Sequence, residues 1–182
     1  MKTKSCFMRL IFKRKINIMK NFGITFGLIL LTSTLIIAQN NIPKLNQEIV
    51  EYVQTVIGKK VDRGECWDLA NHALKKVDAD WDRAFVYGNR INPYEDEVFP
   101  GDLIQFENIV IKYKEGNTTF TETMGQHTAI VYKVKKKGVY EIAHQNTQFS
   151  GRKVGLSDLN INTVVDGEIY FYRQTKKLNT DE

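Results

Sequence analysis

The residue best suited to covalent chemistry is Cys66. The chain's other cysteine, Cys6, lies in a basic N-terminal segment that is set apart from the domain. A thiol without a disulfide partner is a candidate for nucleophilic chemistry. The thiolate is its reactive form, and both a helix N-terminus and a nearby imidazole favour that form. A small buried core residue is the alternative role for Cys66.

The imidazole that could take the thiol proton is His127, which begins an apolar stretch typical of a β-strand. Residues 127–134 and 139–146 are two such stretches around a lysine-rich turn, which predicts a hairpin. With the shortest loop, Asn146 lies directly opposite His127, and opposed side chains share a face. Asn146 is therefore predicted to bond one imidazole nitrogen and leave the other for the thiol. His144 points to the same face and is the alternative.

Three further side chains could contact a substrate. Arg152 and Lys153 follow the predicted hairpin closely and could bind a substrate carboxylate, with a plain surface loop as the alternative. Trp67 could line a groove or belong to the core. The cysteine and the two histidines could together bind zinc, but their spacing fits no common zinc motif. The sequence therefore predicts neither a metal nor an organic cofactor.

Two amphipathic helices precede the strands and must position the cysteine. Apolar residues recur at helical spacing through residues 45–57, and again from Cys66 to Val77, where one apolar face includes the thiol. Asp62 followed by Glu65 resembles a capping box, which places Cys66 in the first helical turn. Helices followed by antiparallel strands predict an α+β fold. The strand-like stretches are residues 103–106, 127–134, 139–146 and 168–173.

The basic character of the chain resides in its N-terminus. Seven of the 26 Lys and Arg residues lie within residues 1–38, which hold no acidic residue. The 19 that remain face 21 acidic residues, so nucleic acid is not an expected partner of the domain. The basic segment, an apolar stretch and the small residue Ala38 predict a signal peptide over residues 1–38.

Export to the periplasm or the medium, without stable membrane insertion after cleavage, follows from this prediction. An uncleaved anchor is the alternative. Residues 39–182 are predicted to form a single domain with its core at 42–175.

Three short motifs resemble CHAP and NlpC-type cysteine amidases and peptidases. They are residues 64–70 around the cysteine, residues 100–106 with a Pro-Gly-Asp turn, and residues 126–131 around the histidine. In that family a cysteine opens a helix, a histidine opens a strand, and a polar residue on the next strand orients the histidine. The resemblance implies a papain-like fold with Cys66 as nucleophile, His127 as general base, and Asn146 or His144 as the orienting residue.

The motifs also resemble the cysteine-proteinase-fold domain of fungal actin-patch adaptors, which shares the Ala-His-Gln-Asn of residues 143–146. Those relatives have no cell-wall peptide to cut. The sequence lacks a papain-like oxyanion-hole glutamine, which would fall near Lys60, so the Cys66 N–H has to serve. Two functions stay open. One is an exported thiol hydrolase that cleaves an amide or peptide bond, with peptidoglycan stem peptides expected by family analogy alone. The other is a catalytically quiet papain-fold binding or scaffold domain.

Overall fold

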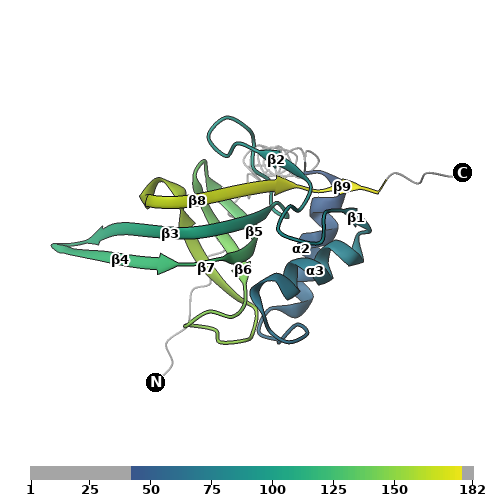
Figure 1. Ribbon diagram of the computed structural model, residues 1–182, viewed down its shortest axis with the longest axis horizontal. Coiled ribbons are helices and arrows are strands. Elements are labelled where there is room, and N and C mark those ends of the chain that lie inside the picture. The colour runs from purple at the N-terminus through teal and green to yellow at the C-terminus, as the bar shows by residue number, and fades with distance from the viewer. Residues whose placement is uncertain (1–41, 178–182) are drawn as a thin grey trace, which may run out of the picture. The chain divides into compact units, whose positions relative to one another are not determined.

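The computed structural model describes residues 42–177 (Figure 1). Two helices come first, α2 (Lys44–Val56) and α3 (Cys66–Lys76). A series of strands and one 3-10 turn follow: β1 (Ala79–Asp80), β2 (Asn89–Ile91), β3 (Leu103–Glu115), β4 (Thr118–Met124), β5 (His127–Lys136), β6 (Val139–His144), β7 (Gly155–Asn160), η1 (Ile161–Thr163), β8 (Val164–Arg173) and β9 (Thr175–Lys176). This order confirms the predicted α+β class.

The predicted signal peptide, residues 1–38, lies outside the described residues. Within residues 42–177, no helix combines the length and the apolar character that crossing a membrane requires.

Seven strands form one antiparallel sheet in the order β2-β8-β3-β5-β6-β7, and β4 pairs with the distal part of β3. The hairpin of β3 and β4 extends away from the helices (Figure 1). β1 and β9 form a separate two-stranded pair. The strand that begins with His127 therefore lies inside the sheet, between β3 and β6.

Alternating side chains bury both faces of this sheet. Leu103 and Ile130 pack with the apolar faces of α2 and α3 in one cluster. Their neighbours Ile104 and Val131 belong to a second cluster, as expected when successive strand residues point to opposite faces. Because β3 and β5 are packed on both sides, the start of β5 is held firmly in place.

The Pro-Gly-Asp turn links the first helix to the sheet. Asp102 is fully buried, and it accepts hydrogen bonds from Asn46 Nδ2 and Arg173 Nη2, both at 2.8 Å. Burial raises the pKa of the Asp102 carboxyl, and the bonds from Arg173 oppose that rise. Gly101 has φ +91°, and a Cβ there would lie 2.4 Å from the Asn46 carbonyl oxygen. The turn therefore requires glycine and has a structural role.

Several strand boundaries differ from the predicted ones. β3 continues to Glu115, because its distal part pairs with the exposed strand β4. β8 already begins at Val164. The hairpin loop is the two-residue turn Lys137–Gly138, and β6 ends at His144 rather than at Asn146. This last difference decides which residue reaches the imidazole.

Candidate active site

Helix α3 begins at Cys66, which confirms that the thiol lies in the first helical turn. The cap itself is shifted from the predicted pair. Glu65 is the N-cap residue, and its backbone N–H donates to the Asp68 carboxylate at 3.0 Å. Asp68 also pairs with Arg63 at 2.8 Å. The capping box therefore joins Glu65 to Asp68, and the predicted box of Asp62 and Glu65 is wrong.

The sulfur of Cys66 lies against the start of β5. Backbone N–H groups of Thr128, Trp67 and Cys66 itself lie near the sulfur and lower the pKa of the thiol. Burial nevertheless raises the pKa of the Cys66 thiol, because it outweighs those three donors. Burial thus opposes the expected preference for the thiolate, which stays a prediction. Thr128 follows His127 in the chain, so the His127 imidazole points to the opposite face of β5, where it lies beside Phe106 and away from the helices.

A buried network fixes Thr128 beside the sulfur. Its hydroxyl donates to Gln105 Oε1 at 2.7 Å and bonds the Tyr87 hydroxyl at 2.9 Å. All three side chains are buried. Burial raises the pKa of Tyr87 far above its ordinary value, so its hydroxyl stays protonated. This network holds in place the backbone N–H that meets the thiol.

The two candidate histidines are bonded to each other. His127 Nε2 lies 2.9 Å from His144 Nδ1, and His144 Nε2 lies 2.7 Å from Ser157 Oγ. The two rings meet edge to face at a centroid distance of 5.1 Å. They are 7% and 3% exposed. Together these residues form a hydrogen-bonded chain, His127–His144–Ser157, that crosses from β5 through β6 to β7.

Burial keeps both imidazoles neutral. It lowers the pKa of His127 to about 4. It also lowers the pKa of His144 to about 3, to which the nearby positive charge of a protonated His127 adds. When His144 donates to Ser157, its Nδ1 accepts from His127 Nε2–H, and Nδ1 of His127 is left without a proton. In this tautomer His127 can act as a base.

Asn146 does not reach the imidazole, so the predicted contact between Asn146 and His127 is wrong. The predicted register holds where Ile130 pairs with Ala143. However, β6 ends two residues before Asn146, whose φ of +63° turns the backbone out of the strand. Its amide nitrogen instead donates to Glu65 Oε2 at 2.9 Å. The alternative residue, His144, contacts His127.

Sequence reasoning missed Gln145, which holds the loop before the nucleophile. Its amide nitrogen donates to the carbonyl oxygens of Val61 and Glu65, at 3.1 and 2.7 Å. Its oxygen accepts from the Val61 N–H at 3.2 Å. Because it follows His144 in sequence, Gln145 points to the other face, toward the helices. That alternation was the available signal for this role.

The residues predicted to bind substrate lie on the rim of this region. Arg152 pairs with Glu65 at 2.8 Å and donates to the Arg63 carbonyl oxygen, so a protein carboxylate already occupies it. Lys153 is exposed. Trp67 is half-buried, with its ring centroid 6.4 Å from that of Trp81. The structure thus gives Arg152 a structural partner and leaves the substrate contacts of all three as predictions.

Neither Cys66 nor the histidine chain lines either of two cavities of about 890 and 320 Å³. Over residues 42–177, no group of three or more His, Cys, Asp or Glu side chains is arranged to hold a metal ion. The arrangement thus consists of a half-buried thiol at the start of α3 and a separate hydrogen-bonded chain of two imidazoles and Ser157.

Comparison with known proteins gives a family match and a similar solved structure. The sequence matches the family of the AIM3/BBC1 cysteine proteinase-fold domain over residues 39–180. No curated protein matches it. Among solved structures, the crystal structure of Ly7917 is similar, with 14% identity and a TM-score of 0.43. The match covers 70% of this chain and 62% of that one, so this chain spans less than two thirds of its length.

The family match covers helix α3 and every strand of the sheet, and it fits the predicted papain-like α+β fold. The predicted likeness to the actin-patch adaptor domains is confirmed. The chain belongs to the AIM3/BBC1 cysteine proteinase-fold domain family.

Proposed function

We propose that this domain is a thiol hydrolase that cleaves an amide bond, with Cys66 as nucleophile, His127 as general base and His144 as the orienting residue. The hydrogen-bonded chain from His127 through His144 to Ser157 carries the proposal. Burial disfavours the cationic form of both imidazoles, and a protonated His127 further disfavours that of His144. Such perturbed groups gather at functional sites.

The neutral resting state sets the order of proton transfers. The sulfur of Cys66 bonds to the substrate carbonyl carbon while the thiol proton passes to Nδ1 of His127, which requires the imidazole to turn toward the helix face at the start of β5. The resulting imidazolium donates through Nε2–H to His144 Nδ1, which holds the ring in place. His127 then gives the proton to the leaving amine, the carbon–nitrogen bond breaks, and water hydrolyses the thioester.

Backbone donors surround the reacting sulfur. The N–H groups of Cys66, Trp67 and Thr128 lie near the sulfur in the resting site. An oxyanion that forms on the carbon attached to this sulfur lies within reach of the same group of donors. These N–H groups therefore stand in for the absent oxyanion-hole glutamine.

The substrate class rests on the leader and on family resemblance. Export through a signal peptide at residues 1–38 would deliver the domain to the cell envelope. The CHAP and NlpC-type motifs point to peptide amide bonds of peptidoglycan stems. Trp67 and Trp81, which are half-buried and packed together, provide an apolar wall on the helix side of the thiol.

Two observations favour the second candidate, a catalytically quiet binding domain. Neither cavity lies over Cys66. The pKa of the thiol is raised, whereas an activated nucleophile has a lowered one. On this account the two imidazoles and the thiol are buried packing groups, and the domain binds a partner without turnover.

Digestion of purified peptidoglycan separates the two candidates. The purified protein and its Cys66→Ser variant are incubated with sacculi, and the soluble products are identified by mass spectrometry. New stem-peptide termini with the unchanged protein, and none with Cys66→Ser, support the hydrolase. Binding to sacculi by both proteins, without new termini, supports the binding domain.

A further inference from the structure

The edge of the sheet at β8 is largely open. β2 pairs with β8 only opposite Phe171, Tyr172 and Arg173. On its other side, β8 pairs with β3 from Val164 onward. Within residues 42–177, no strand pairs with the Val164–Tyr170 stretch on the side away from β3. Alternate backbone N–H and C=O groups of this stretch therefore lack a strand partner.

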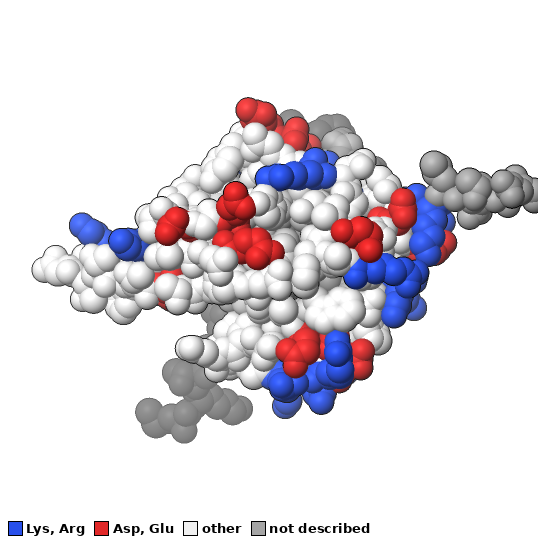
Figure 2. Space-filling view, in the orientation of Figure 1, with Lys and Arg blue, Asp and Glu red and all other residues white. Residues whose placement is uncertain are grey.

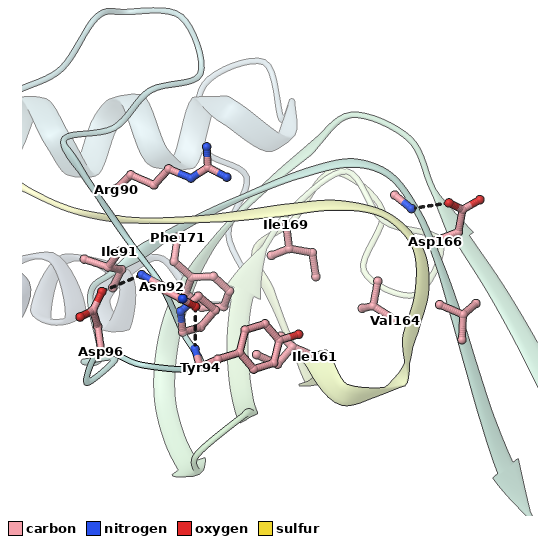
Figure 3. A pocket seen from close by; sticks show the side chains of 13 residues that line it. Arg90, Ile91, Asn92, Tyr94, Asp96, Ile161, Val164, Asp166, Ile169 and Phe171 are labelled. Atoms are coloured by element: carbon pink, nitrogen blue, oxygen red, sulfur yellow. Dashed lines mark hydrogen bonds between the residues drawn. The ribbon is translucent and has the colours of Figure 1, made fainter.

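A cavity of about 890 Å³ lies along this open edge, where the chain leaves β2 (Figure 3). Its apolar wall continues the second core cluster to the surface through Ile91, Ile161, Val164, Ile169 and Phe171. Ile91 and Phe171 are directly paired and so share this face of the sheet. A strand that continued the line of β2 along β8 would place alternate side chains in this cavity.

The surroundings of the edge are acidic. Asp166 and Glu168 are exposed on β8, and Asp96 lines the cavity from the loop that follows β2. In the described domain, none of these three carboxylates forms a salt bridge with Lys or Arg. Figure 2 shows acidic side chains gathered where β3 and β8 run side by side. The nearby cation, Arg90, lies over the Tyr170 ring, 4.1 Å from its centroid.

Alternation along β8 places its apolar side chains and Glu168 on opposite faces of the strand. Ile169 and Phe171 point into the cavity, and Glu168 falls between the cavity-facing positions of the strand. An added strand would thus meet apolar side chains on the cavity face, where Asp96 and Asp166 also lie, and Glu168 on the other face. The unpaired stretch from Val164 to Tyr170 contains an irregularity at Gly167, which has φ +82°, so regular pairing is available on either side of that residue.

We propose that the groove along Val164–Tyr170 binds an extended peptide as an added strand, and that this peptide alternates bulky apolar residues with Lys or Arg. The apolar residues fill the cavity, the basic residues meet Glu168 and its neighbours, and the backbone completes the ladder of β8. The groove contains neither Cys66 nor the two histidines, so this binding is independent of the proposed hydrolase activity.

Titration with a designed peptide tests the proposal. A fluorescein-labelled peptide of four lysines alternating with three isoleucines is added to the purified protein, and binding is followed by anisotropy. Saturable binding is expected, with amide signals of residues 164–170 shifting in NMR spectra and exchanging more slowly with solvent. A matched peptide with glutamate in place of lysine should bind at least about tenfold more weakly.

Two exposed carboxylates supply matched variants. Glu168→Lys should weaken binding of the lysine peptide by about tenfold or more, because it reverses a charge on the open edge. Glu115→Lys makes the same change of net charge on the distal hairpin of β3 and should change binding less than about twofold.

Equal binding to both variants would mean non-specific attraction and would overturn the proposal. An absence of saturable binding at millimolar peptide would do the same. Concentration-dependent dimerisation that protects residues 164–170 without peptide would assign the edge to a second copy instead.

Discussion

Acid should unfold this domain through its two buried imidazoles. The pKa values of His127 and His144 are about 4 and about 3 in the folded chain, against an ordinary value of 6.5. Between pH 6.5 and these values, the unfolded chain binds protons at both sites and the folded chain does not. Stability is therefore complete above about pH 6.5 and is lost as the pH falls.

The size of this effect follows from the number of protons. Each proton that only the unfolded chain binds lowers the free energy of unfolding by about 1.4 kcal/mol for each pH unit lost. With two such sites, the slope should approach about 2.7 kcal/mol per pH unit near pH 5. The buried carboxyl of Asp102 has a raised pKa and acts in the opposite direction, so the comparison between variants carries the test.

Urea denaturation at pH 7, 6 and 5, followed by tryptophan fluorescence, measures the slope. His144→Gln removes one titrating group and should lower the slope by about 1.4 kcal/mol per pH unit. His72→Gln is the matched control, because the His72 side chain is 42% exposed. It should leave the slope unchanged. A slope that His144→Gln does not reduce would refute the reasoning.

Three further predictions concern the thiol, the orienting residue and the Pro-Gly-Asp turn. Iodoacetamide should alkylate Cys66 more slowly at pH 7 than it alkylates free cysteine, because burial raises the pKa of the thiol. The rate is followed by intact mass. A faster rate than that of free cysteine would contradict the effect of burial. In a steady-state assay, His144→Ala should lower kcat by about 100- to 1000-fold. Asn146→Gly should change kcat little, because glycine accepts the φ of +63° that Asn146 has. The reverse result would restore Asn146 as the orienting residue. Gly101→Ala should lower the free energy of unfolding, measured by urea denaturation, by roughly 2 to 4 kcal/mol, because the added Cβ meets the Asn46 backbone. Gly116→Ala should lower it by about 1 kcal/mol, because Gly116 also has a positive φ, +58°, but open space around it. Equal losses would show that the close contact at Gly101 does not matter.

The helices and the order of the site residues could be predicted from the sequence. Apolar spacing placed the second helix at residue 66, where α3 begins. His127 was predicted to begin a strand and begins β5. These features depend on local periodicity, which the sequence displays directly.

The orienting residue depended on where one strand ends, which periodicity does not display. The hairpin register was correct at Ile130 and Ala143, but two register shifts follow toward the turn, and β6 stops at His144. Ser157 could not be found in advance, because its contact with His144 depends on how β7 pairs with β6. Pairing between distant strands leaves no local pattern in the sequence.

The direction in which the pKa of the Cys66 thiol shifts could not be predicted from the sequence either. A helix N-terminus lowers a thiol pKa, and burial raises it. Only the packing of Cys66 against the start of β5 shows that burial is the larger effect here.

Covalent capture of the acyl group tests the proposed role of Cys66 most directly. The protein is mixed with a stem-peptide substrate that it cleaves, the reaction is quenched with acid within milliseconds, and the intact mass is measured. The account predicts a thioester adduct on Cys66, formed before free product in the unchanged protein and absent from Cys66→Ser. Cleavage that continues in Cys66→Ser would contradict the account.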